Sequence, residues 1–185
     1  MRKLTINGKY LILEGFKNVK IKNLQTIFSF LKTPKKDCYI QLFNAEVIAG
    51  FDHLYFACLN ALKAFEQGKN ISKDLAVETL LYASGQHQIN KAIQMLGVTQ
   101  ETKDIAVLIV SEKPETSLEA LEKTAHLLRG EQCDRILCVT KKKMQNIKST
   151  LNIKETELRA AMRDSEEQAL TNLLIERAAL LAAQT

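Results

Sequence analysis

Short apolar runs alternate with longer stretches whose apolar residues recur every three or four positions. Four runs rich in strand-forming residues predict strands at residues 10–13, 38–43, 105–110 and 135–139. The run at 105–110, IAVLIV, carries no polar side chain, which is typical of a strand buried on both faces. Gly15 is expected to end the first strand.

Helical spacing covers most of the remaining chain. It predicts helices over about 24–33, 53–67, 73–84, 89–96, 115–129, 141–151, 155–162 and 165–183. In the fourth of these, Ile89, Ala92, Ile93 and Leu96 are predicted to face inward. The alternation indicates an α/β protein with a mixed sheet of about four short strands surrounded by seven or eight helices. No linker-like stretch divides residues 1–185, so a single domain is expected.

The overall composition is that of an ordinary globular protein, but the distribution of charge along the chain bears on the kind of partner. Hydrophobic residues make up 46% of the chain and charged residues 25%, as in an ordinary globular protein. Residues 1–36 carry a net charge of +8, whereas residues 37–185 carry a net charge of −3. A basic stretch on a near-neutral body favours an anionic partner such as nucleic acid. The alternative is a solvated, lysine-rich face.

Sequence signatures of catalysis and cofactor binding are missing. The chain has no GxxxxGK[ST], GxGxxG, HExxH or GxSxG motif. His53, His87 and His126 lack a metal partner at helical spacing, and the four cysteines form no CxxC. We therefore expect a binding module with neither a metal nor a cofactor. Unpaired cysteines, and the absence of an 18-residue apolar window, favour a cytoplasmic protein with no membrane partner.

The segment Ser84-Gly85-Gln86-His87-Gln88 is not explained by apolar spacing. A glycine between two helical patterns indicates a break, and a break leaves the first amides of the following helix unpaired. Ser84 is expected to cap one of them, and the positive end of that helix suits a phosphate or a hydroxyl. His87, Lys91 and Gln94 recur at helical spacing and so form one polar stripe. The alternative is a capped turn with an ordinary wetted face.

The residues around this segment resemble those of a known protein family. Residues 78–98, ETLLYASGQHQINKAIQMLGV, resemble the PRPK-binding protein family, the small kinase-partner subunit of the KEOPS (EKC) complex. The family pattern, E-x-L-x-Y-x-S-G-x-x-Q-I-x-x-A-I-x-x-x-G-[IV], matches without a gap from Glu78 to Val98. Residues 41–65 and 173–181 resemble the family at lower density. His87 stands where many relatives have arginine, so a cationic role there depends on pH or on Lys91.

The resemblance implies a non-catalytic subunit that binds the kinase-like ATPase of the complex and holds tRNA by its 3′ CCA end. The complex makes threonylcarbamoyladenosine at tRNA position 37. Bases of a single-stranded end are recognised by stacking, amide hydrogen bonds and basic side chains. The candidate RNA-binding residues that supply these groups are Phe51, His53, Tyr82, Ser84, Gly85, Gln86, His87, Gln88, Ile89 and Lys91. Basic residues that could follow the acceptor stem are Lys17, Lys20, Lys22, Lys32, Lys35 and Lys36.

The last predicted helix, about 165–183, has apolar residues on more than one stripe. A surface helix needs only one apolar face, so a second stripe suggests a protein partner. The alternative is a helix buried on two sides within this chain. The resemblance favours the partner, with a predicted contact set of Leu170, Leu173, Leu174, Arg177 and Leu181.

Two other functions compatible with the sequence belong to different classes. One is a small RNA-processing enzyme that uses His87 as acid or base. The other is a purely structural adaptor, in which the basic end of the chain serves only solubility.

Overall fold

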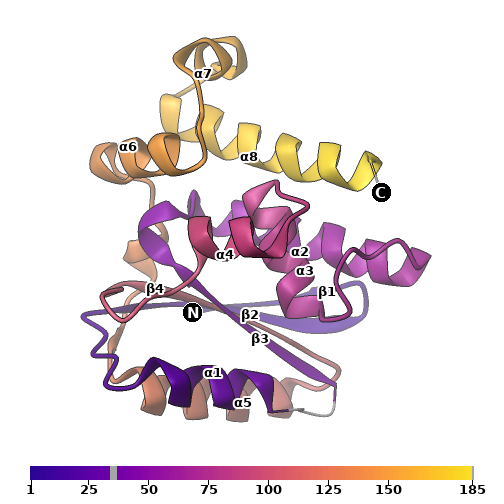
Figure 1. Cartoon of the computed structure of the whole chain (residues 1–185), viewed down its shortest axis with the longest axis vertical. Coiled ribbons are helices and arrows are strands. Elements are labelled where there is room, and N and C mark those ends of the chain that lie inside the picture. Colours follow the sequence, from indigo (N-terminus) through magenta and orange to yellow (C-terminus); the bar gives the residue numbers. More distant parts are fainter. Residues whose placement is uncertain (34–36, 185) are drawn as a thin grey trace. The chain divides into compact units, whose positions relative to one another are not determined.

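The computed structural model describes residues 1–33 and 37–184. The chain divides into two compact units (Figure 1). Unit 1 comprises Met1–Ala45 and Val98–Ile136, and unit 2 comprises Glu46–Gly97 and Leu137–Thr185. The expected α/β class is confirmed, whereas the single domain stays a prediction.

Unit 1 is built on an antiparallel sheet. Its main strands are β1 (Arg2–Ile6), β2 (Lys9–Lys17), β3 (Cys38–Asn44) and β4 (Ile105–Ser111), in the order β1-β2-β4-β3. The short β5 (Glu131–Gln132) pairs with the end of β2. Every pairing among the described residues is antiparallel, so the predicted mixed sheet is wrong in strand direction.

The β1–β2 hairpin was missed by the apolar pattern because β1 is mostly exposed. Its turn is Asn7-Gly8, with both φ angles positive, at 46° and 72°. An Asn-Gly pair in that conformation matches the twist of two antiparallel strands. The strand predicted at 105–110 is confirmed as β4, which lies between β2 and β3 and is buried along its whole length.

Helices α1 (Leu24–Lys32) and α5 (Pro114–Leu128) cover one face of this sheet (Figure 1). The shared core lies where alternate strand residues meet these helices, as at Ile12, Ile40 and Val107. The predicted strand at 135–139 is wrong, because Asp134–Leu137 forms the 3-10 helix η2. The Cys133 amide donates to the Gly15 carbonyl oxygen at 2.7 Å, immediately before η2 begins.

Unit 2 is helical. Its helices are α2 (Gly50–Gln67), α3 (Leu75–Ser84), α4 (Ile89–Leu96), α6 (Lys141–Thr150), α7 (Glu155–Ala161) and α8 (Glu166–Ala183). The 3-10 helix η1 (Ala45–Val47) joins β3 to this group. Helix α2 packs against α3 and α8, and α8 also contacts α3 and α7. No helix in the described part of the chain has the length and apolar character needed to cross a bilayer.

Candidate functional site

The predicted break between two helices is present at the end of α3. Gly85 adopts the left-handed conformation, with φ of 63°. Its amide donates to the Tyr82 carbonyl at 3.2 Å, and the Gln86 amide donates to the Leu81 carbonyl at 3.1 Å. This pair of bonds is the Schellman arrangement, which ends a helix and turns the chain away. The following residues therefore leave the helix axis before α4 begins at Ile89.

Ser84 does not cap the second helix, so this part of the prediction is wrong. Its hydroxyl donates to the Leu81 carbonyl at 3.0 Å, within its own helix. The N-terminal capping position of α4 is occupied by Gln88, and its side chain forms no capping hydrogen bond with the first turn. The amide groups of that turn consequently have no partner from the capping side chain.

His53 forms hydrogen bonds next to the break. The ring is fully buried, its Nδ1 accepts from the Ala49 amide at 3.2 Å, and its Nε2 donates to the Ala83 carbonyl at 2.8 Å. Burial, with a smaller contribution from nearby Lys143, lowers the pKa of His53 to about 4. The hydrogen bond to Ala83 opposes that shift. A neutral ring thus joins the first turn of α2 to the last turn of α3.

The predicted RNA-binding residues fall into a buried group and an accessible group. His53, Tyr82 and Ser84 are buried, and the side chains of His53 and Ser84 form hydrogen bonds within the protein. A role for these three residues as RNA contacts stays a prediction. The accessible members are partly exposed or exposed, and they are Phe51, Gly85, Gln86, His87, Gln88, Ile89 and Lys91. Of these, Gly85 to Ile89 are consecutive in the chain, and Lys91 follows two residues later.

The polar stripe on α4 reaches solvent as expected. His87, Lys91 and Gln94 are all exposed. His87 Nε2 donates to Oε1 of Gln184 at 3.2 Å, which joins the break to the end of α8. The prediction for the opposite side of α4 is half right: Ala92 and Leu96 are buried, whereas Ile89 and Ile93 are 39% and 48% exposed.

The basic residues near the N-terminus belong to unit 1. Lys20 and Lys22 are exposed, and Lys17 forms an ion pair with Glu131 at 3.0 Å. Lys32 ends α1, while Lys35 and Lys36 lie outside the described residues. Their role along an acceptor stem stays a prediction.

Helix α8 does not present the predicted apolar stripe. Leu170, Leu174 and Leu181 are buried, because α8 lies against α2, α3 and α7 within unit 2. This burial matches the alternative of a helix packed on more than one side, and contact of α8 with a partner stays a prediction. Leu173 is only partly exposed. The exposed apolar residue that the prediction missed is Leu180, at 55%.

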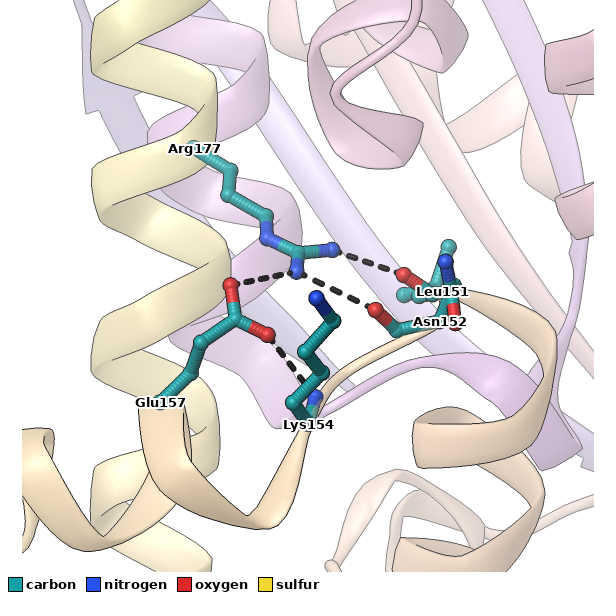
Figure 2. A network of polar contacts seen from close by, with 5 residues as sticks. All are labelled: Leu151, Asn152, Lys154, Glu157 and Arg177. Carbon is teal, nitrogen blue, oxygen red and sulfur yellow. Dashed lines mark hydrogen bonds and ion pairs between the residues drawn. The ribbon is translucent and has the colours of Figure 1, made fainter.

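Arg177 has an internal role that the sequence did not indicate. Its Nη1 donates to the Leu151 carbonyl at 2.7 Å, and its Nη2 lies 3.1 Å from Oε1 of Glu157 (Figure 2). Contacts of this kind, 20 and 26 residues apart in the chain, leave no local signal in a sequence.

Other reactive groups do not gather into a site. Within residues 1–33 and 37–184, no group of three or more His, Cys, Asp or Glu side chains is placed to hold a metal ion. Burial raises the pKa of the Cys58 thiol to about 12, so this thiol is protonated at neutral pH.

Comparison with known proteins agrees with the resemblance seen at residues 78–98. A family model described as kinase binding protein CGI-121 matches residues 16–182. The regulatory protein Cgi121 of Methanocaldococcus jannaschii is 31% identical over 145 residues, which cover 78% of this chain and 86% of that protein. The chain therefore belongs to the CGI-121 family of kinase binding proteins.

Proposed function

We propose that this protein is a non-catalytic subunit of a KEOPS complex. In this role it docks on the kinase-like ATPase subunit and holds tRNA by the 3′ CCA end, in the cytoplasm, while threonylcarbamoyladenosine is formed at position 37. The observation that carries the proposal is the exposed segment from Gln86 to Lys91 at the α3–α4 break. The family name and the name of the M. jannaschii relative support a regulatory role beside a kinase.

The chemistry of the break suits the end of an RNA strand. Uncapped amides at the start of α4 and the positive end of its dipole favour a phosphate. Side-chain amides of Gln86 and Gln88 both donate and accept, which allows hydrogen bonds to a base edge or a ribose hydroxyl. Lys91 adds a cation one turn along from His87. Hydrogen bonds from the buried His53 and Ser84 to carbonyl groups of α3 stabilise the helix end that precedes this segment.

Binding of tRNA with and without its CCA end tests the RNA role. We expect Gly85→Glu to weaken the binding of intact tRNA, because it places a carboxylate beside the amides of α4. Gly68→Glu is a matched control, since Gly68 also ends a helix with φ of 66° and has open space around it. Equal affinity of the wild-type protein for intact and trimmed tRNA would contradict the 3′-end assignment.

The kinase-docking surface is proposed on α4 and α8. Ile89 and Ile93 lie one turn apart on α4, and Leu180 lies one turn before Gln184, whose side chain bonds to His87. The hydrogen bond links the two segments that carry these exposed apolar side chains. Burying such side chains against a partner stabilises a complex, with aliphatic anchors surrounded by polar residues.

Co-purification with the kinase-like subunit tests this surface. Leu180→Glu and Ile93→Glu are expected to release the kinase while the protein stays folded. Met162→Glu changes an equally exposed apolar residue before α8 and is expected to leave the complex intact. Retention of the kinase by both test variants would show that another face docks it.

A further inference from the structure

Arg177 connects the α3–α4 break to a turn elsewhere in unit 2. A Cβ atom at position 85 would lie 3.5 Å from the Cβ of Arg177, so α8 runs directly behind Gly85 at this residue. The guanidinium group lies at the other end of the side chain, near the turn between α6 and α7 (Figure 2). Arg177 thus lies close to Gly85 at its Cβ and binds the α6–α7 turn through its guanidinium group.

The guanidinium group of Arg177 binds backbone carbonyl groups at the C-terminal end of α6. Leu151 is the C-terminal cap of α6, and its carbonyl accepts from Nη1 at 2.7 Å, while the Asn152 carbonyl lies 3.5 Å from Nη2. Carbonyls at a helix C-terminus have no partner inside the helix, and they lie at the negative end of its dipole. Arg177 supplies both the missing donors and a positive charge.

Glu157 orients this guanidinium group. Its Oε1 lies 3.1 Å from Nη2 of Arg177, and its Oε2 accepts from the Lys154 amide at 2.8 Å. The carboxylate therefore joins the start of α7 to α8, and Arg177 joins both to the end of α6 (Figure 2). These contacts restrict sliding or rotation of α8 relative to the α6–α7 turn.

We infer that Arg177 is a positioning residue for the α3–α4 break. By fixing α8 against the α6–α7 turn, it keeps the backbone of α8 behind Gly85, and so holds the segment that follows in its binding conformation. This inference rests on the proposed RNA-binding function of that segment. In this role Arg177 acts without touching RNA or kinase.

Hydrogen exchange tests the inference without RNA. The amides of Gly85 and Gln86 are bonded to the end of α3. In Arg177→Met we expect them to exchange about tenfold faster than in the wild type, and in Arg177→Lys to show an intermediate rate. Arg163→Met removes the same charge from an exposed residue and should leave these rates unchanged. Unchanged exchange at Gly85 and Gln86 in Arg177→Met would overturn the inference.

Binding of intact and trimmed tRNA gives the second readout. Arg177→Met should weaken the binding of intact tRNA about three- to tenfold and leave the binding of CCA-trimmed tRNA unchanged. Adding Glu157→Ala to Arg177→Met should cause little further loss of tRNA binding, because the contact between Glu157 and Arg177 is already lost in Arg177→Met. Equal losses for both RNAs would indicate a simple charge effect and overturn the positioning role. A wild type without 3′-end preference contradicts the proposed function, and the exchange rates still decide the role of Arg177 at the break.

Discussion

His53 gives the protein a stability that depends on pH. Its Nδ1 accepts a hydrogen bond from the Ala49 backbone amide, so the native ring must be neutral. Burial lowers the pKa from 6.5 to about 4, whereas an unfolded chain protonates histidine near the ordinary value. Because the unfolded state binds the proton first, the free energy of unfolding falls as the pH drops from about 6.5 toward 4. The loss is at most about 3 kcal/mol.

Denaturant unfolding at a series of pH values measures this effect. His53→Gln keeps one donor and one acceptor but does not titrate, so its free energy of unfolding should change less over the same pH window. It should also be lower than that of the wild type at pH 7, because the amide cannot match both ring contacts. Parallel pH profiles for the two proteins would assign the acid sensitivity to other groups.

Individual residues also show where sequence-based inference stops. Gly85 was identified because a glycine between helical patterns has few explanations, and its positive φ confirms the break. His53 and Ser84 look equally polar in the sequence, yet both are buried with partners 30 and 3 residues away. A polar side chain signals that a hydrogen bond is needed, but it does not say whether RNA or the protein itself provides it.

At the scale of the element, Gly15 shows how a strand can require a glycine without ending there. The strand β2 continues to Lys17. A Cβ atom at Gly15 would lie 2.5 Å from the Cys133 carbonyl oxygen, which is too close for any side chain. Close approach of another segment is a recognised use of glycine within strands. The pattern was correct in marking an irregularity and wrong about its kind, because Cys133 is distant in the sequence.

Substitution of this glycine is therefore expected to be costly. Gly15→Ala should lower the free energy of unfolding by about 1–3 kcal/mol through overpacking. Gly8→Ala offers a comparison, since nothing lies within 4 Å of its added Cβ and only the positive φ, 72°, is strained. The strain alone costs about 1 kcal/mol. If denaturation curves show the smaller loss for Gly15→Ala, the close approach of Cys133 is relaxed in solution.

Helix α8 illustrates a second limit at this scale. Its surplus of apolar residues can be satisfied by a partner or by the other helices of unit 2, and the periodicity is the same in both cases. Burial resolves the ambiguity, with Leu174 at 2% exposure and Leu180 at 55%. The predicted element was right, whereas the assignment of its faces needed the positions of α2, α3 and α7.

The two leucines should differ sharply in stability measurements on the isolated protein. Leu174→Ala removes core packing and is expected to lower the free energy of unfolding by about 2–5 kcal/mol. Leu180→Ala should stay within about 0.5 kcal/mol of the wild type. Similar losses for both variants would mean that Leu180 is packed within the chain, which would also weaken its proposed docking role.

For the whole molecule, the relevant quantity is the distribution of charge. Unit 1 contains 14 Lys/Arg and 10 Asp/Glu residues, and unit 2 contains 12 and 11. The strongly basic first 36 residues are thus partly balanced within unit 1 by acidic residues in the segment 98–136. In ion pairs such as Lys17 with Glu131, a basic side chain from the first segment lies next to an acidic side chain from the second. Exposed lysines outside such pairs, including Lys20 and Lys22, are the better candidates for phosphate contacts.

Salt dependence of tRNA binding tests those two lysines. Each phosphate contact contributes about 0.7–0.9 to the slope of log affinity against log salt. The double variant Lys20→Gln, Lys22→Gln should reduce that slope by about 1.5 in magnitude and weaken intact and trimmed tRNA equally. Lys69→Gln, Lys73→Gln removes the same charge from exposed positions of unit 2 and should leave the slope unchanged. An unchanged slope in the first variant would make the basic end a solvated face, and the selection of tRNA would then depend on the α3–α4 break alone.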